Sequence, residues 1–395
     1  MFKGNSLTNI RILHGLSRKQ LADRIGVTEQ AIWQYENGYV SPKLEVVNRL
    51  KVIFNVKSSY FYHDDILSSY NKDNILIENI AYRSSTINSL QKTQSESMHI
   101  RFIDSFLKKV ETRISYPMNI LLELRNYTIN YLKQNPDMNK DSLIKHVADY
   151  SRKKIGMDSN SNNNFLFLLE RAGAFVFEKE IGDSIDAYSL WSEDNRAYIV
   201  LGTVKKSAVR RNFDLAHELG HLLLHYKVEF SIQDKKDYRA LEDEANQFAS
   251  EFLLPEYQFS LDCENIGKKS NPDAYIELKE KWLVSLQAMA ARAFKLGIID
   301  YQQYRYFYML VNKKGYKQVE PLDNRIPIER PSKVKSILQL LFDKEFYTVT
   351  EIMDELRINQ GFLTILTGLE EEFFTKNRQR EDNSSTVNEL IFKTN

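Results

Sequence analysis

Apolar positions recur along most of the chain at the spacing of amphipathic helices, with two short exceptions. Helical periodicity covers 7–62, 237–253 and 256–310, and shorter helices are expected within 331–375. The runs AFVFEKE and AYIVLG, the second at 197–202, are instead apolar over lengths typical of strands. The pattern therefore predicts a mainly α protein with a small β-sheet, of the α+β class.

Start and stop signals divide the first part of the chain into short helices. Ser17 and Gln20 have the spacing of a capping box, Gly26 breaks the helix that follows, and Thr28 can cap the next one. Gly38 ends that helix, and Pro42 is expected to begin another. Small and branched residues suit the close corner between the two helices, namely Leu21, Ala22, Ile25, Val27 and Ile32. The spacing predicts a helix-turn-helix.

Changes in pattern along the chain suggest four consecutive segments. Residues 1–64 form the helical head, and the polar segment 65–140 is expected to be a helical spacer with helices at 101–110 and 117–133. A second domain is expected over 141–300, and 301–395 is expected to be a C-terminal helical region of unknown role.

Composition and charge indicate the compartment of the protein and the part of the chain that meets nucleic acid. The single cysteine, Cys263, excludes an intrachain disulfide framework and fits a reducing compartment. The N-terminus lacks the apolar core of a signal peptide, and the most apolar later run, at 165–177, is too short to span a bilayer. We therefore expect a soluble, cytoplasmic protein with no membrane partner.

Residues 1–63 carry nine Lys or Arg and four Asp or Glu, although the whole chain has a net charge of only +1. This asymmetry predicts that the head alone meets nucleic acid.

The second helix of the predicted helix-turn-helix has polar residues on its outward side, which are Glu29, Gln30, Trp33 and Gln34. Glutamine can make a bidentate contact with adenine in the major groove, and base edges are reached from the first half of a recognition helix. The alternative is a helical hairpin that serves only to dock another protein.

The stretch SRKQLADRIGVTEQAIWQYENGYVSP, which begins at Ser17, resembles the XRE-type helix-turn-helix of phage repressors. The resemblance implies that Gln30 and Gln34, with Glu29 nearby, face the bases of double-stranded operator DNA. It places Gln20 and Asn37 near phosphates, with Arg11 and Arg18 as possible neighbours. Trp33 departs from the polar residue often found there and would pack on a thymine methyl or on a partner protein. A homodimer on a two-fold operator is expected.

The stretch FDLAHELGHLLLH at 213–225 carries the candidate metal chemistry. On a helix, His217 and His221 project from one face about 6 Å apart along the axis, so both rings can bind one tetrahedral Zn²⁺ ion. Glu218 lies beside that face, where it can act as a general base rather than a ligand. Gly220 would allow a neighbouring backbone to approach closely. The alternative is a helix that carries histidines by chance.

A third ligand is expected from LEDEANQFASEFLLP, which ends at Pro255. Glu242 and Asn246 share a helix face, so Glu242 can bind the metal while Asn246 orients a histidine. Glu244 points about 200° away around the helix and is the alternative ligand. Solvated carboxylates with no metal role are equally compatible with this pattern. His225, one turn beyond His221, is expected to be a capping or core residue rather than a fourth ligand.

Three stretches together resemble the ImmA/IrrE metallopeptidases, regulators that cleave repressor proteins: RRNFDLAHELGHLLLH, EDEAN and FASEFLLP. The resemblance implies a gluzincin site in a zincin-like domain, with His217, His221 and Glu242 as zinc ligands and Glu218 as general base. Asn246 stands where related zincins often have an aspartate. Arg210 matches an arginine of the family, with a surface arginine as the alternative. Tyr188 and Tyr226 are candidates for the residue that stabilises the oxyanion.

The leading hypothesis is a DNA-binding transcriptional regulator with a zinc-dependent endopeptidase domain. Its substrate would be a regulatory protein or its own spacer at 65–140. In the second hypothesis the zincin-like domain is a non-catalytic sensor, which binds a small molecule or a partner such as an anti-repressor. A third hypothesis is an antitoxin-like protein whose body holds a partner while its head regulates transcription.

Overall fold

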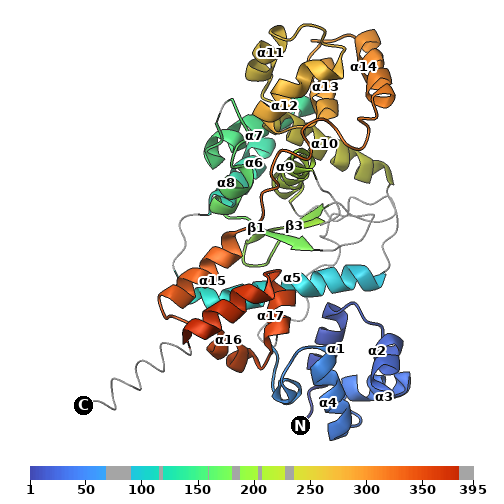
Figure 1. Cartoon of the computed structure of the whole chain (residues 1–395), viewed down its shortest axis with the longest axis vertical. Helices are drawn as coiled ribbons and strands as arrows, with labels where there is room; N and C mark the ends of the chain where they lie inside the picture. The colour runs from blue at the N-terminus through green and yellow to red at the C-terminus, as the bar shows by residue number, and fades with distance from the viewer. Residues whose placement is uncertain are drawn as a thin grey trace, which may run out of the picture. The chain divides into compact units, whose positions relative to one another are not determined.

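The computed structural model describes residues 1–67, 90–114, 119–158, 160–179, 187–202, 207–226 and 235–381 (Figure 1). The chain divides into two compact units, each considered by itself below. The head unit combines 1–77, 86–116 and 334–395, whereas the central unit combines 78–85 and 117–333. This division differs from the four consecutive segments expected from sequence, because the central unit is inserted into the chain of the head unit.

The head unit begins with the helices predicted from their end signals. They are α1 (Gly4–Leu13), α2 (Arg18–Ile25), α3 (Glu29–Glu36), α4 (Leu44–Ile53) and the 3₁₀ helix η1 (Ser58–Tyr62). Both halves of the Ser17–Gln20 capping box are present, and the Thr28 hydroxyl accepts from the backbone N–H of Ala31. Gly26 ends α2 with a φ of 66°, a left-handed conformation that favours glycine. The predicted helix-turn-helix is confirmed.

A buried carboxylate joins the first three helices of the head unit. Glu36, at the end of α3, is only 6% exposed. Its Oε1 accepts from Arg11 Nε of α1 at 2.5 Å, and its Oε2 accepts from Arg18 Nε of α2 at 2.5 Å. Arg11 is itself buried and also donates to the Leu16 carbonyl, so the expectation that Arg11 lies near DNA phosphates is wrong. Its charge is needed inside the head to compensate Glu36.

Helices from distant parts of the chain complete the head unit. They are α5 (Leu90–Glu111), α15 (Lys333–Asp343), α16 (Val349–Leu356), α17 (Gln360–Thr367) and a last helix at 371–381. The Ser95 hydroxyl of α5 donates to the Leu13 carbonyl of α1. An isolated bridge pairs Val56 with Ile358, and the Lys57 N–H donates to the Arg357 carbonyl at 2.9 Å. Much of the expected spacer and of the expected C-terminal region is therefore part of the head unit.

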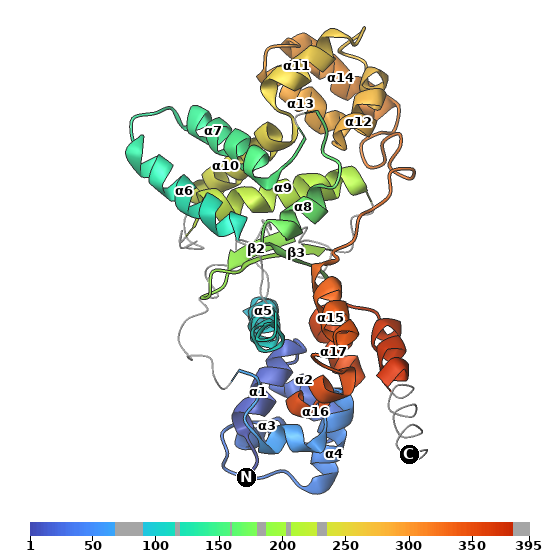
Figure 2. The same cartoon turned by 90° about the vertical axis from the view of Figure 1, so that its left-hand side faces the viewer.

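The central unit contains a three-stranded sheet in the order β1–β3–β2. The strands are β1 (Phe175–Lys179), β2 (Ala187–Trp191) and β3 (Ala197–Gly202). β1 is parallel to β3, while β2 is antiparallel to β3 and lies at an edge of the sheet. The sequence predicted β1 and β3 but not β2. Figure 2 shows β2 and β3 beneath α8 and α9 of the same unit.

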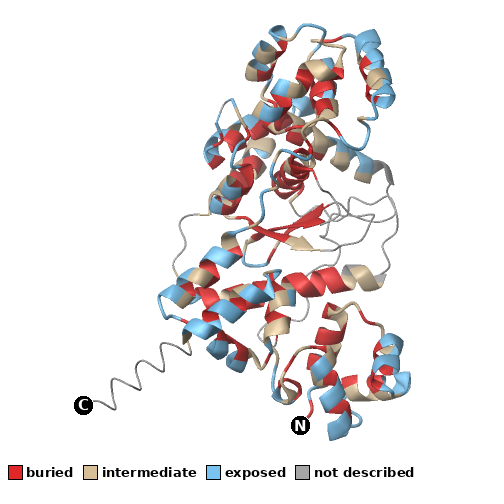
Figure 3. Cartoon of the chain, in the orientation of Figure 1, coloured by how far each residue is buried: buried red, intermediate tan, exposed pale blue. Residues whose placement is uncertain are grey.

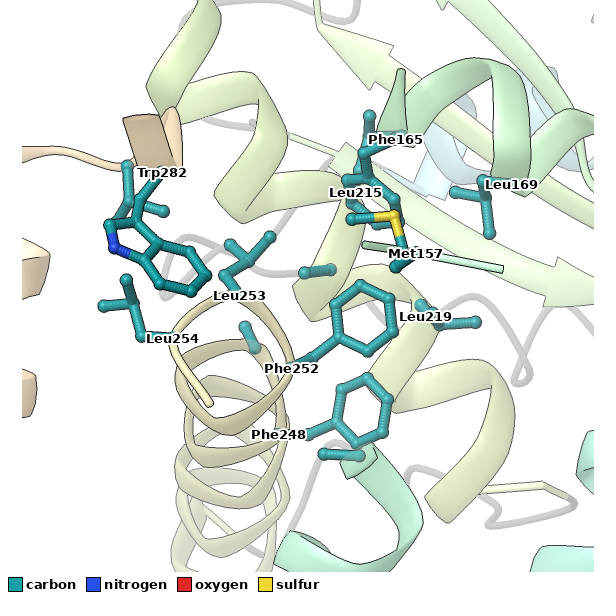
Figure 4. Close-up of a cluster of buried hydrophobic side chains, with 14 of the residues drawn as sticks. Met157, Phe165, Leu169, Leu215, Leu219, Phe248, Phe252, Leu253, Leu254 and Trp282 are labelled. Carbon is teal, nitrogen blue, oxygen red and sulfur yellow. The ribbon is translucent and has the colours of Figure 1, made fainter. Parts of the chain in front are cut away.

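Helices cover the sheet and build the core of the central unit. They are α6 (Ile120–Gln134), α7 (Lys140–Ile155), α8 (Phe165–Arg171), α9 (Ala208–Leu224), α10 (Lys235–Leu253), α11 (Glu256–Glu264), η3 (Pro272–Tyr275), α12 (Ile276–Trp282), α13 (Leu286–Lys295) and α14 (Tyr301–Lys313). α9 is buried along most of its length (Figure 3). Leu215 and Leu219 of α9 lie in one apolar cluster with Phe248 and Phe252 of α10 (Figure 4). This cluster fixes the two helices that carry the candidate metal ligands.

Among the described residues, no helix is both long enough and apolar enough to cross a membrane.

Replacing the buried carboxylate in Glu36→Ala should destabilise the head unit by about 3–5 kcal/mol. Removing one partner of a buried ion pair leaves the other charge, here that of Arg11, without compensation. Hydrogen exchange of the full-length protein, followed by mass spectrometry, would detect this as lost amide protection in α1 and α3. The exposed Glu29→Ala is the control and should change protection by less than about 0.5 kcal/mol. Equal protection in Glu36→Ala and wild type would show that the buried pair contributes little.

Candidate metal centre and nucleic-acid interface

α9 and α10 bring three side chains to one point. His217 Nε2 lies 3.0 Å from His221 Nε2. The carboxylate of Glu242 approaches both rings, with 3.4 Å from Oε2 to His217 Nε2 and 3.4 Å from Oε1 to His221 Nε2. Among the described residues these form a group of three possible metal ligands whose ligating atoms lie within 4.8 Å of one another. The structure therefore brings together the three residues that the sequence singled out.

The chemistry of these atoms fits a tetrahedral zinc ion. Two ligands that each lie 2.0–2.1 Å from zinc at a tetrahedral angle are about 3.3 Å apart, close to the three distances observed. Among the described residues, the buried Glu242 Oε1 has no hydrogen-bond partner, which is costly unless another group binds it. A metal ion at this point would compensate the orphaned oxygen.

Neighbouring side chains contact the other ring nitrogen of each histidine. His217 Nδ1 lies 3.0 Å from Asn246 Oδ1, the contact that the helical spacing of Glu242 and Asn246 suggested. His221 Nδ1 lies 2.9 Å from His225 Nδ1, and His225 Nε2 lies 3.2 Å from Glu244 Oε2. Glu244, the alternative ligand, contacts His225 and pairs with Lys140 rather than joining the group of three.

The environment of Glu242 keeps it as an anion. Burial by itself would raise the pKa of this carboxyl, but its contacts with His217 and His221 outweigh burial and hold the pKa far below the usual range. A carboxylate ligand must be deprotonated to bind a metal ion.

Glu218, the expected general base, lies in a buried position beside the histidines. Its Oε2 accepts a hydrogen bond of 2.7 Å from the hydroxyl of Ser189 on β2. Sequence reasoning missed Ser189 because β2 was not predicted. The alternation of side chains along a strand is the signal that could have found it, once a strand before β3 is assumed.

Gly220 allows α9 and α10 to pack closely, although not as expected. A Cβ atom at this position would lie 3.1 Å from Phe248 Cδ1 and 3.2 Å from Phe248 Cβ. The neighbour is therefore a side chain of α10, and the expectation that a backbone approaches here is wrong. Contacts of this length leave little room for even a methyl group.

The two tyrosines and Arg210 have surroundings other than those guessed. Tyr188 is fully buried and directly precedes Ser189 within β2, so it points to the opposite face of the sheet from Ser189 and Glu218. The Arg125 guanidinium lies 4.1 Å from the centre of the Tyr226 ring. Arg210 donates to the Gln318 carbonyl at 2.6 Å and holds the segment that follows α14. These contacts give no support to an oxyanion role for Tyr188.

The outward side of α3 is the candidate nucleic-acid interface. Glu29, Gln30 and Asn37 are exposed, and Gln34 is half-buried. Trp33 is 42% exposed, and its ring stacks on that of Tyr39 with the ring centres 5.1 Å apart. This stacked pair enlarges the apolar surface that the sequence placed at Trp33 alone.

Gln20 has a structural task besides the expected one. Its Oε1 accepts from the Ser17 N–H at 2.8 Å and from Gln91 Nε2 of α5 at 3.0 Å. The oxygen is therefore engaged, and a phosphate would be met by the side-chain amide N–H groups, which are donors.

Comparisons with known proteins match two parts of the chain to known families. Residues 7–61 match the helix-turn-helix family, and residues 169–294 match the family described as the IrrE N-terminal-like domain, a peptidase family. An uncharacterized HTH-type transcriptional regulator of Methanocaldococcus jannaschii is 35% identical over 63 residues, which is 96% of that protein and 15% of this chain.

Fold and matches together define a DNA-binding regulator domain combined with a metallopeptidase-like domain. The chain belongs to the XRE-type helix-turn-helix family through its head, and its central unit carries an IrrE N-terminal-like domain.

Proposed function

We propose that this protein is a DNA-binding transcriptional regulator whose central unit is a zinc-dependent endopeptidase acting on a regulatory protein. The observation that carries the proposal is the convergence of His217 Nε2, His221 Nε2 and the Glu242 carboxylate. Glu218 directly follows His217 on α9. Two imidazoles and one carboxylate are the protein ligands of a catalytic zinc site that keeps a further position open.

The residues of the chain divide the work at such a centre. His217, His221 and Glu242 would hold zinc, which when bound polarises a peptide carbonyl and lowers the pKa of its water from about 15.7 to near 7. Glu218 would accept a proton at its carboxylate and return it to the leaving amine. Ser189 fixes the orientation of that carboxylate through its hydroxyl.

The position of β2 at an edge of the sheet supports the proposal that the substrate is a peptide. Among the described residues, β2 pairs only with β3, so its other edge is available to main-chain hydrogen bonds from an extended segment. Ser189 of this strand contacts Glu218 directly, which brings the edge close to the expected base.

A cleaved segment would have to be extended. Within the described part of the spacer at 65–140, α5 and α6 are helical, which favours a separate protein as substrate over these two segments.

A second candidate function is a non-catalytic metal-containing sensor. The observation that favours it is the burial of His217, His221 and Glu218, each at most 6% exposed. Structural zinc sites are closed, whereas catalytic ones must admit a substrate. In this alternative the central unit would bind a small molecule or a partner protein and alter DNA binding without hydrolysis.

Elemental analysis of the purified protein should find about one zinc per chain. His217→Ala and Glu242→Ala should each lose most of it, because two ligands seldom retain zinc where three are needed. His146→Ala, which replaces a half-buried histidine of the same unit, is the control and should keep the metal. Zinc retained in Glu242→Ala would exclude Glu242 as third ligand, and wild type without zinc after reconstitution would favour a site that binds no metal.

If the central unit is a peptidase, Glu218→Gln should abolish processing of the regulatory protein while zinc remains bound. General base catalysis contributes about 10²–10⁴-fold to rate, so fragments seen with wild type in induced cells should fall below detection. Glu277→Gln makes the same chemical change at an exposed position of the central unit and should leave processing intact. Fragment patterns that are identical in Glu218→Gln and wild type, with promoter control intact, would contradict the peptidase and support the sensor.

The head should bind a two-fold operator as a homodimer. On a fragment selected from random DNA by wild type, Gln30→Ala and Gln34→Ala should each weaken binding by about 1–3 kcal/mol, as expected for loss of a bidentate base contact. The control is Asn48→Ala on the exposed side of α4. Half-sites should lie one helical turn apart, about 10–10.5 base pairs. A selected site without two-fold symmetry, or equal binding by all variants, would count against this arrangement.

A further inference from the structure

The third histidine of α9 lies against the candidate metal centre without facing it. The ligating atoms of His217 and His221 are their Nε2 atoms, which meet each other and Glu242. His225 contacts the opposite nitrogen, Nδ1 of His221, at 2.9 Å. His225 is therefore placed behind His221 as seen from the centre, and it is not a fourth ligand.

The contacts run from His221 through His225 to Glu244, and the carboxylate of Glu244 determines which ring nitrogens carry hydrogen. The Glu244 carboxylate is paired with Lys140 and can only accept hydrogen bonds. His225 Nε2, 3.2 Å from Glu244 Oε2, must then carry the hydrogen, and a neutral His225 has its lone pair at Nδ1. The hydrogen between the two rings must therefore belong to His221 Nδ1. That leaves the lone pair of His221 at Nε2, where it faces the centre.

We propose that His225, held by Glu244, is a positioning residue that fixes the ring orientation and the metal-binding tautomer of His221. This inference rests on the proposed metal centre and adds to it a control over one ligand. Histidines that bind metals commonly donate their other N–H to a carboxylate, a carbonyl or water, and losing that acceptor weakens metal binding. Here an imidazole stands between the ligand and its carboxylate.

The two ligand histidines are thus supported differently from the same helix. α10 supplies Asn246 directly to His217, and it supplies Glu244 to His221 by way of His225. Lys140, at the start of α7, pairs with Glu244 and extends the chain of contacts to a third helix. Without His225, the N–H of buried His221 would lose this acceptor, and the other tautomer, with its hydrogen on Nε2, would no longer be disfavoured.

The test compares zinc affinity in full-length variants by competition with a chromophoric chelator. His225→Phe keeps a ring of similar size but offers no acceptor, so zinc should bind about 10–100-fold more weakly than to wild type. His225→Asn places an amide oxygen near the position of Nδ1 and should restore affinity to within about threefold. His146→Phe, at a half-buried histidine that contacts Tyr127, should change nothing.

A second comparison tests whether Glu244 acts through His225. Glu244→Leu should weaken zinc binding in the same direction, and adding it to His225→Phe should cause little further loss, because both changes break one chain. The visible absorption of the cobalt(II)-loaded protein gives a readout independent of activity. It should show that His225→Asn keeps the coordination of wild type.

The outcomes separate this inference from the proposed function. Wild-type protein that binds zinc, with His225→Phe equally tight, would overturn the positioning role and leave the metal centre intact. Equal losses in His225→Asn and His225→Phe, or a changed cobalt spectrum in His225→Asn, would also overturn it, since the acceptor would not be the cause. A wild-type protein that binds no zinc would overturn the metal centre itself, and the inference with it.

Discussion

The packing of α9 against α10 is the constraint on which the candidate centre depends. α9 contributes His217, Glu218 and His221, while α10 contributes Glu242 and Asn246, so the site exists only at one separation and one register of the two helices. Phe248 packs where Gly220 has no side chain, and the apolar cluster around it holds that register. The apolar faces of these helices are therefore as necessary to the chemistry as the ligands, because an error of 1 Å would separate ligating atoms that must lie about 3.3 Å apart.

A comparable constraint operates in the head unit. Glu36 draws Arg11 and Arg18 to the end of α3, so one buried carboxylate fixes three helices and presents the recognition surface of α3. The unit is completed by α5 and by the helices after 333, which come from either side of the central unit in sequence. The inserted unit is therefore joined covalently at both ends to segments of the DNA-binding unit.

Local signals in the sequence predicted the parts whose reasons are local. Capping residues and glycines predicted the ends of α2 and α3. Helical spacing predicted that His217 and His221 share one face, and that Glu242 shares a face of its own helix with Asn246. What failed depends on distant contacts. Arg11 was expected near DNA phosphates, but it pairs with the buried Glu36, which lies 25 positions further along the chain. Ser189 was not predicted because it lies on β2, a strand whose pairing partner comes later in the chain. The union of 334–381 with the head also rests on pairing between residues some 300 positions apart, which no periodicity reveals.

The balance between peptidase and sensor turns on Glu218. A scaffold that only holds a metal needs His217, His221 and Glu242, and nothing in that task calls for a further buried carboxylate. Burying such a group is unfavourable unless hydrogen bonds compensate it, and here Ser189 of the edge strand donates directly to it. The compensation comes from the element best suited to bind an extended peptide. This coupling of base, candidate metal ligands and edge strand is the argument for preferring the proposed hydrolysis over a sensor without catalysis.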